Sequence, residues 1–425
     1  MILRARIVLP ITAPPVEDGA VLVSGDRVLA VGAWTDLRAD HTGPVHDLGD
    51  VVLLPGLVDA HCHLDYTHLA GQLAPPRSFP DWIKAILAAK NGWGFSEFAA
   101  SWLDGARQLL RSGTTTVADI ASVPELLDVC RGTVPLRVWS SIEMTGVRSQ
   151  RPPAEILAAA EELIRGLPTG RGGFGLSPHA PYSTTPGLLR LCGEAMRRDG
   201  RLVTSHVAES QAEFEMFMFR RGPMFEWLEH QRPMDDCGHG SPVRHLDRCG
   251  LLGARHLLAH VNYLWDGDAR LLAERGASVV HCPQSHAYFR HHRFPRTDLA
   301  EAGVNLCLGT DSLASTRFAK GRPQELSLFD EMRVLAATDS QVSPDEILAM
   351  ATVNGARALG LLGEVGMIAP GHKADLVAIP FSGDLSRATD AVVHHDGDVA
   401  AAWIDGIREW CGDRTGPVSP CPAAR

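Results

Sequence analysis

Residues 53–63 read LLPGLVDAHCH, an apolar strand-like run that ends in two histidines separated by one residue. Residues two apart on an extended strand point to the same face, so the imidazoles of His61 and His63 can meet at one point. Neutral imidazole is a common metal ligand. The pair predicts about half of a catalytic metal site at the carboxyl end of a strand. Two polar histidines in an ordinary turn is the alternative interpretation.

The composition restricts the class of protein. The chain has 425 residues, 45% of them apolar, which is enough for a large core and a smaller second unit. The net charge is -10 and no run of lysines and arginines occurs, so we expect no nucleic-acid partner. No apolar run is long enough to cross a bilayer, and the start lacks the apolar centre of a signal peptide. We therefore expect a cytoplasmic protein with no membrane partner.

The central part of the chain alternates strand-like runs with amphipathic helical patterns, such as 154–165, 186–198 and 266–274. This alternation favours a parallel sheet, and eight such units over this length predict a (β/α)8 TIM-like barrel of the α/β class. An open doubly wound sheet is the alternative, although no Gly-x-Gly-x-x-Gly turn follows an early strand. The expected strands are 57–63, 115–120, 136–143, 174–179, 202–206, 257–261, 278–282 and 304–309.

Short strand-like runs also occur at both ends of the chain, at 2–9, 19–24 and 27–31 and again at 374–379, 399–404 and 406–410. We expect them to pair, and we predict a small β-sandwich domain built from residues 1–53 with 366–412. Residues 54–365 would form the catalytic barrel, and the proline-rich residues 413–425 a loose tail.

Most of the expected strands from the fourth onward end in a histidine or an acid: His179, His206, His260, His281 and Asp311. In a barrel all strand carboxyl ends meet on one face, which is where active sites lie. Any one of these residues could be a hydrogen-bonded core side chain. Their repetition at strand ends instead favours a shared functional site.

These motifs resemble the signatures of the metal-dependent amidohydrolase superfamily. The resemblance is to the branch that contains S-adenosylhomocysteine and adenosine-type deaminases, guanine deaminase and the triazine chlorohydrolases. The residues that carry it are HCH at 61–63, SPHAPYS at 177–183, SHVAE at 205–209, LAHV at 258–261, HCP at 281–283 and GTDS at 309–312.

The resemblance implies a single divalent metal ion. Some members hold two ions bridged by a carboxylated lysine at the end of strand four, but here that strand carries His179 and none of the four lysines lies near it. The implied ligands are His61, His63, His206 and Asp311. Zinc fits three imidazoles and a carboxylate, and iron(II) or manganese can use the same ligand types.

The implied activity is the hydrolysis of C–N bonds other than peptide bonds. Deamination of an amino-substituted N-heterocycle, a purine-like base or nucleoside derivative, is the main hypothesis for this small-molecule substrate. Glu209 would act as the general acid, and His260 and Asp311 would take the proton of the attacking water. The expected substrate-binding residues are His179, Trp82, Arg148 and His281.

Two departures from the branch leave the substrate open. Residues 281–286 read HCPQSH where the deaminases usually have His-Asn-Pro-x-Ser-Asn, and no acid occurs from 83 to 91, where nucleoside deaminases supply one to the ribose. Ring-amide opening or dechlorination at the same site is one alternative, and a catalytically silent binding protein is another. The segment 214–228, rich in Met, Phe and Trp, indicates helix packing, a lid, or the contact of a homodimer.

Overall fold

The computed structural model describes residues 1–425 apart from 40, 75, 148, 150, 318–323 and 413–425. Its centre is a parallel sheet of eight strands in which each strand pairs with the next along the chain. The ring closes where Cys62 bridges to Asp311, whose carbonyl accepts the His63 N–H at 2.9 Å. The strands are β6 (Leu57–Cys62), β7 (Thr114–Ala121), β8 (Arg137–Met144), β9 (Gly172–Pro178), β10 (Leu202–Val207), β11 (His256–His260), β12 (Ser278–His281) and β13 (Asn305–Leu308).

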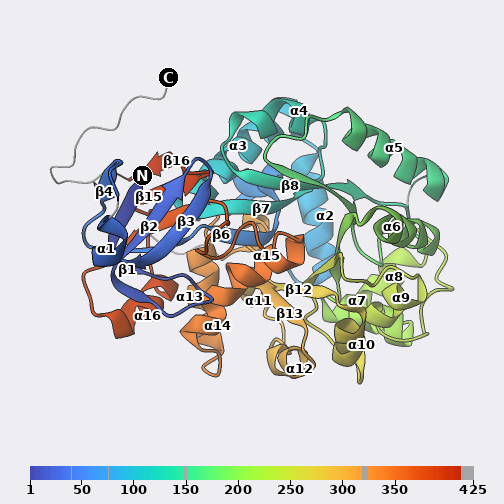
Figure 1. Ribbon diagram of the computed structural model, residues 1–425. Helices are drawn as coiled ribbons and strands as arrows, with labels where there is room; N and C mark the ends of the chain where they lie inside the picture. The colour runs from blue at the N-terminus through green and yellow to red at the C-terminus, as the bar shows by residue number, and fades with distance from the viewer. Residues whose placement is uncertain (40, 75, 148, 150, 318–323, 413–425) are drawn as a thin grey trace.

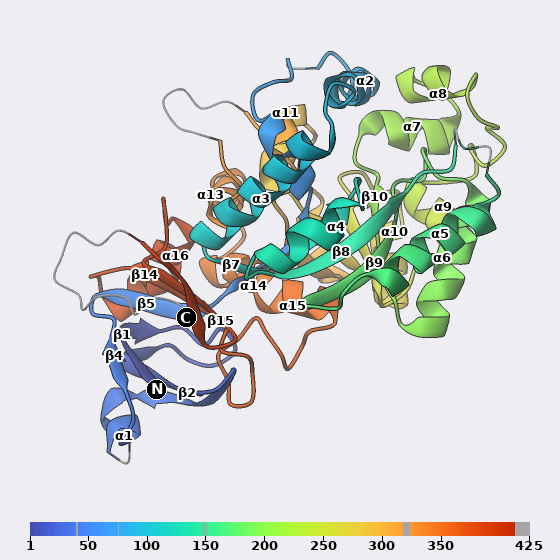
Figure 2. The same cartoon turned by 90° about the horizontal axis from the view of Figure 1, so that it is seen from above.

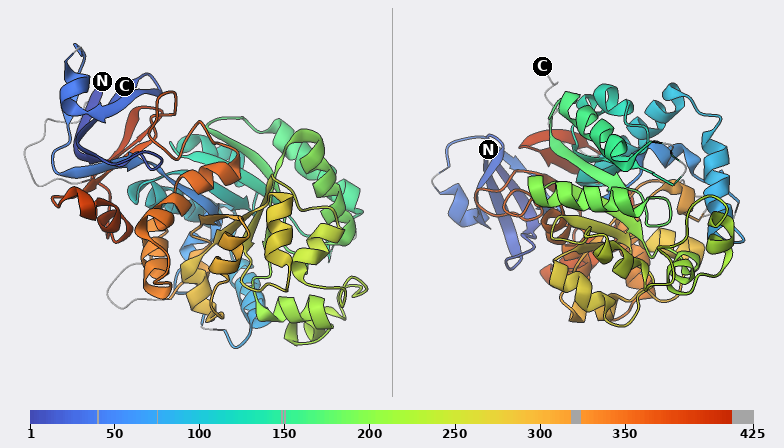
Figure 3. Two further views of the ribbon diagram at one scale, coloured as in Figure 1. Left: turned by 60° about the horizontal axis from the view of Figure 1, so that its bottom comes forward. Right: turned by 90° about the vertical axis from the view of Figure 1, so that its right-hand side faces the viewer.

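Helices surround this ring, so the predicted (β/α)8 barrel is confirmed (Figures 1 and 3). The helical patterns at 154–165, 186–198 and 266–274 correspond to α5, α6 and α10. The barrel helices are α2 (Phe79–Lys90), α3 (Phe95–Arg111), α4 (Leu126–Cys130), α5 (Pro153–Gly166), α6 (Pro186–Asp199), α7 (Gln211–Phe219), α8 (Pro223–Leu228), α9 (Pro242–Arg248), α10 (Asp268–Arg275), α11 (Pro283–Phe289), α12 (Arg296–Glu301), α13 (Leu328–Thr338), α14 (Pro344–Met350) and α15 (Val353–Leu359).

The strands are apolar runs because both of their faces are covered. Every residue of β6, β7, β10, β11 and β12 is buried. On α3, the buried residues Phe98, Trp102, Ala106 and Leu109 recur at helical spacing and form the face that packs inward. The Trp102 indole donates to Asp119 Oδ2 of β7 at 3.0 Å, which fixes the helix against its strand.

The two ends of the chain build a separate mixed sheet, as expected (Figure 2). β5 joins the two halves, because it pairs in parallel with β1 and antiparallel with β14. The exact domain boundaries stay a prediction, and the predicted tail lies outside the described residues. The strands are β1 (Ile2–Val8), β2 (Val16–Ser24), β3 (Arg27–Ala33), β4 (Val45–Asp47), β5 (Val51–Pro55), β14 (Leu376–Pro380), β15 (Ala401–Ile404) and β16 (Ile407–Cys411), with helices α1 (Trp34–Arg38) and α16 (Ala388–Val393).

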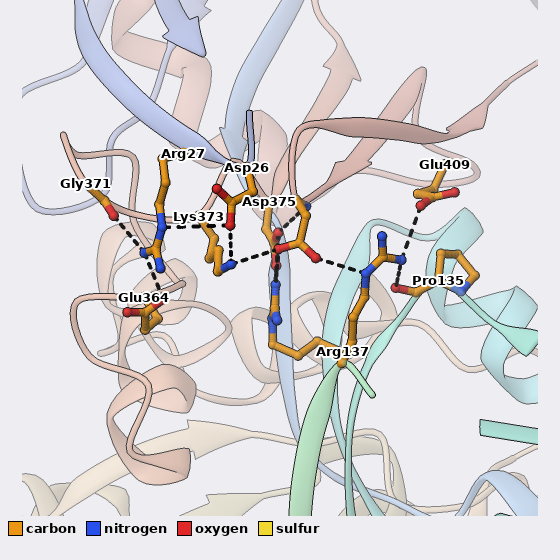
Figure 4. A network of polar contacts seen from close by, with 11 residues as sticks. Asp26, Arg27, Pro135, Arg137, Glu364, Gly371, Lys373, Asp375 and Glu409 are labelled. Carbon is orange, nitrogen blue, oxygen red and sulfur yellow. Dashed lines mark hydrogen bonds and ion pairs between the residues drawn. The ribbon is translucent and has the colours of Figure 1, made fainter. Parts of the chain in front are cut away.

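A network of ion pairs attaches this terminal sheet to the barrel (Figure 4). Arg137, the first residue of β8, lies 3.1 Å from Asp375 and 2.9 Å from Asp405. Lys373 contacts Asp26 and lies 3.4 Å from Asp405. Because the contact is at the amino end of β8, the carboxyl ends of the barrel strands remain available for a site. Within the described residues, no helix is both long and apolar enough to span a membrane.

Candidate active site

Three of the four predicted ligands, His61, His206 and Asp311, meet at the carboxyl ends of the barrel strands together with His260, which was predicted to take a proton rather than to bind the ion. His61, His206, His260 and Asp311 each offer one ligand atom, and all four atoms lie within 4.8 Å of one another. His63 adjoins them, with Nε2 3.1 Å from His206 Nε2 and 3.7 Å from Asp311 Oδ1. All five side chains are buried. His61 and Asp311 are the first and last of these five residues along the chain, so the structure brings together residues up to 250 positions apart in the sequence.

Asp59 holds the first and last strands of the cluster together. Its Oδ1 accepts the backbone N–H of His61 at 3.2 Å and of Thr310 at 3.1 Å, and its Oδ2 accepts the Thr310 hydroxyl at 2.6 Å. A Cβ at Gly309 would lie 2.7 Å from the His61 carbonyl oxygen, so only glycine allows this approach. The sequence patterns missed Asp59, because it lies inside an apolar strand.

The histidines have the protonation state that a divalent ion needs. Burial lowers the pKa of His206 to about 3 and that of His63 and His260 well below the ordinary value, so the rings are neutral. His206 Nδ1 donates to the His179 carbonyl at 3.0 Å, which leaves Nε2 free as a ligand. Among the described residues, both nitrogens of His61 and Nε2 of His260 are buried without a hydrogen-bond partner. This donor set fits a divalent metal ion.

Asp311 supplies the negative charge of the cluster. Burial alone would raise its pKa, but the interaction with His61 and the nearby His260 and His63 outweigh burial and hold the pKa below its ordinary value. Ser315 donates to Oδ2 at 3.0 Å, whereas Oδ1 lies 3.6 Å from His61 Nε2. Oδ1 is therefore the oxygen placed to bind the ion.

Glu209 lies at the edge of the cluster. Its Oε1 is 3.7 Å from His260 Nε2, and the residue is 4% exposed. Burial, together with the charges of Asp311 and Glu213, raises the pKa of Glu209 well above its ordinary value. Its carboxyl group can therefore hold a proton near neutral pH, which is the property of a general acid.

A cavity of about 250 Å³ adjoins the cluster, and His63, His206, Glu209, Asp311 and His179 contribute to its wall. Burial, with the nearby charge of Lys90, lowers the pKa of His179 to about 4, so this ring is neutral as well. The cavity is large enough for a heterocycle and directs that ligand toward Glu209 and the cluster.

The other predicted substrate contacts divide into three cases. Trp82 of α2 lines the cavity, and its indole N–H donates to the Ala314 carbonyl at 3.3 Å. His281 is not among the lining residues, because its ring stacks on Phe294 with the centroids 3.8 Å apart. Arg148 lies outside the described residues, so its role stays a prediction.

The cavity wall also contains polar residues that were not predicted as site residues, among them Tyr66 in the 3-10 helix η1 (Leu64–Leu69), Lys90 at the end of α2, and Glu143 in β8. Glu143 is an acid at a strand end, so the pattern that identified the histidines could have found it. Lys90 carries no such signal, because only the packing of α2 brings it to the strand ends.

The segment 214–228 forms part of α7 and α8 and has two roles. Met216, Phe217 and Met224 are buried in a cluster with Phe79, as expected for helix packing. Leu228 of α8 lines the cavity, so the same segment covers the site.

Comparisons with known proteins identify the relatives of this chain. A family model described as the amidohydrolase family matches residues 52–408. The chain is 31% identical over 380 residues to a 5-methylthioadenosine/S-adenosylhomocysteine deaminase of Syntrophobacter fumaroxidans, covering 86% of this chain and 80% of that protein. It is 30% identical over 366 residues to a 5'-deoxyadenosine deaminase of Methanoregula boonei, covering 81% and 75%.

A solved structure shows the same fold. The crystal structure of an adenosine deaminase from Xanthomonas campestris, with bound zinc, has a TM-score of 0.81 and 27% identity, covering 96% of this chain and 92% of that chain. The match of the family model to most of the chain and the buried His–Asp cluster at the strand ends lead to one conclusion. This protein belongs to the amidohydrolase family.

Proposed function

We propose that this protein is a zinc-dependent deaminase that replaces the amino group of an aminopurine nucleoside by oxygen. The observation that carries the proposal is the buried carboxyl group of Glu209, 3.7 Å from His260 at the edge of the cluster and inside the cavity. The relatives named as deaminases of 5-methylthioadenosine and 5'-deoxyadenosine support this class of substrate. Three imidazoles and a carboxylate favour zinc.

In this proposal His61, His63, His206 and Asp311 hold the ion, which supplies Lewis-acid activation of water when bound. Asp311 and His260 accept the proton that the attacking water loses. Glu209 donates a proton to a ring nitrogen, which makes the neighbouring carbon electrophilic. The proton taken from the water is then delivered to the amino group, which leaves as ammonia, and loss of the remaining hydroxyl proton forms the carbonyl and restores the proton of Glu209.

His179 orients the ring. The Ser183 hydroxyl donates to the Ala180 carbonyl at 3.2 Å and so accepts from His179 Nδ1 at 2.6 Å. The tautomer fixed in this way leaves His179 Nε2 as an acceptor toward the cavity wall. It can bind an N–H or O–H group of the ligand.

The test is ammonia release by the zinc-loaded protein from adenosine, 5'-deoxyadenosine, 5'-methylthioadenosine and guanine, with Glu209→Gln as the inactive control. We expect ammonia from at least one of the nucleosides and none above background from the variant. Chloride release from a chlorotriazine without ammonia from any nucleoside would replace this proposal by the dechlorination alternative.

A further inference from the structure

His286 is the last residue of the HCPQSH motif, at a position where the deaminases that the chain resembles usually have asparagine. It lies in α11, the helix that follows β12. The described residues that line the active-site cavity do not include His286, and the proposed reaction gives it no role. Its contacts nevertheless lead to Glu209, the proposed general acid, through two hydrogen bonds.

Asn262 forms the link between these two residues. Its Nδ2 donates to the Glu209 carbonyl at 2.9 Å, and its Oδ1 lies 3.0 Å from His286 Nδ1. A carbonyl group can only accept, so the amide turns Nδ2 toward Glu209 and Oδ1 toward His286. His286 Nδ1 therefore carries a proton and donates it to the hydrogen bond with Asn262. Burial lowers the pKa of His286 to about 4, so the ring is neutral near pH 7.

The linked strand ends have backbone conformations that are costly for residues other than glycine. Ala208 directly precedes Glu209 and has φ 50°, and the residue before Asn262, Val261, also has φ 50°. The backbone N–H groups of Val261 and Asn262 donate to the Val207 and Ala208 carbonyls, each at 3.0 Å. Such conformations persist only where the surroundings maintain them. The Asn262 side chain extends this support to the backbone of Glu209 itself.

α11 is held in place from its other side. Gln284 donates through its backbone N–H and its Nε2 to the two oxygens of the Glu331 carboxyl group of α13, each at 2.8 Å. Glu331 is completely buried. The position of His286 is thus fixed by contacts that do not involve Glu209. His286 can therefore orient the Asn262 amide instead of following it.

We propose that His286 is a positioning residue for Glu209. It orients the Asn262 amide, which holds the Glu209 carbonyl and so keeps the carboxyl group at the edge of the cluster. An asparagine at position 286 could place its Nδ2 where His286 has Nδ1, so both residue types can supply the donor. The inference rests on the proposed function for the role of Glu209, but the order of the backbone around Glu209 can be measured without turnover.

The kinetic test uses the zinc-loaded protein and the substrate from which it releases ammonia fastest. His286→Leu removes the donor, and we expect kcat to fall about 10-fold to 100-fold, as for a catalytic group displaced by about 1 Å. KM should stay within about threefold and the metal content should not change, because the cavity wall and the ligands are untouched. His286→Asn should restore kcat to within about threefold of the parent protein. His292→Leu, an exposed position in the loop after α11, is the matched control and should change neither constant.

A double-mutant cycle tests whether His286 acts through Asn262. When Asn262→Ala has already removed the link, adding His286→Leu should lower kcat by less than about twofold. Normal kcat in His286→Leu, an equal fall in both backgrounds, or no rescue by His286→Asn would overturn the proposal. Urea unfolding checks that each variant is folded. If His286→Leu does not fold, His286→Gln takes its place with the same expected results, because its longer side chain moves the donor away from the Nδ1 position.

Amide hydrogen exchange separates this inference from the proposed function, because it needs no substrate. The Glu209 N–H donates to Glu213 Oε2 at 2.9 Å, so exchange of the segment 208–213 reports whether this backbone stays ordered. Faster exchange of the segment in His286→Leu, restored in His286→Asn, supports the positioning role even if no nucleoside releases ammonia. Exchange in His286→Leu equal to that of the parent protein overturns the positioning role, and ammonia release would then leave the deaminase in place.

Discussion

Glu213→Gln tests how the chain holds Glu209 in position. Glu213 lies in the first turn of α7, where Oε1 accepts the Ala208 N–H at 3.1 Å and Oε2 accepts the Glu209 N–H at 2.9 Å. On the other side of Glu209, its carbonyl oxygen accepts a hydrogen bond from Asn262 Nδ2 at 2.9 Å. Ala208 has φ 50, a left-handed conformation that costs about 1–3 kcal/mol and persists only if such contacts maintain it.

The magnitude follows from these contacts. Glutamine keeps one acceptor oxygen but turns an NH2 group toward the other backbone N–H, so one buried donor loses its partner at a cost of about 1–3 kcal/mol. We expect the free energy of unfolding to fall by that amount. A shift of Glu209 by about 1 Å would also lower kcat by up to about 10²-fold, with metal content unchanged because the ligands are untouched.

The assay combines urea unfolding, kcat and KM for the best nucleoside substrate, and metal content. Glu215→Gln is the matched control on the same helix, because Glu215 is partly exposed and accepts from Gln211 at 3.0 Å near the surface. We expect the control to stay within about 0.5 kcal/mol of the parent protein. If Glu213→Gln behaved like Glu215→Gln in both unfolding and kcat, the clamp on Glu209 would be refuted.

The remaining predictions concern the metal, the proton path and the attachment of the terminal sheet. Metal analysis should find about one divalent ion per chain, lost in His61→Ala and Asp311→Ala, and two ions per chain would contradict the single site. His63→Ala should lose the ion, whereas His260→Ala should keep it and lose activity; the reverse result would exchange their roles. Glu209→Gln should lower kcat by about 10² or more with the fold intact, and normal turnover would exclude it as the general acid. Burial alone would raise the pKa of Asp405, but Arg137, Lys373 and Arg171 outweigh burial and hold the pKa below its ordinary value of 3.8. The stabilisation by Asp405 is therefore present above about pH 4 and lost as the pH falls through the folded-state pKa. When the pH is lowered from about 5 to about 3, the urea midpoint of Asp405→Asn should therefore fall less than that of the parent protein. Equal falls would show that the ion pairs do not stabilise the fold.

The barrel could be predicted from the sequence because its strands are covered on both faces and therefore consist of runs of apolar residues. The first and last residues of the strands were harder to predict. β9 begins at Gly172, two residues before the expected run, because Gly172 and Gly173 have no side chains to form a pattern. Glycine is required at position 172 because a Cβ there would lie only 2.0 Å from the Val138 carbonyl oxygen of the neighbouring strand. A requirement set by a neighbouring strand is not visible in the local sequence.

The buried His–Asp cluster could be predicted for a similar reason, since barrel topology brings every strand end to one face. His281 shows the limit of that argument. It ends a strand as His260 does, yet its ring turns to Phe294 instead of the cavity. Strand-end position predicts the face on which a side chain emerges, but the packing of the next loop decides which way it points.

The arrangement separates the chemistry from the choice of substrate. His61, His206, His260 and Asp311 come from strands and are fixed by strand pairing and by Asp59, so the cluster cannot change without cost to the barrel. The wall that would contact the distal part of the substrate comes instead from side chains of α2, α8 and the end of β8. Substitutions there leave the strand pairing intact. Relatives that share the cluster can therefore differ in substrate. The motifs of the cluster identify the family, whereas cavity-wall residues such as Lys90 and Glu143 are where the substrate choice of this protein has to be tested.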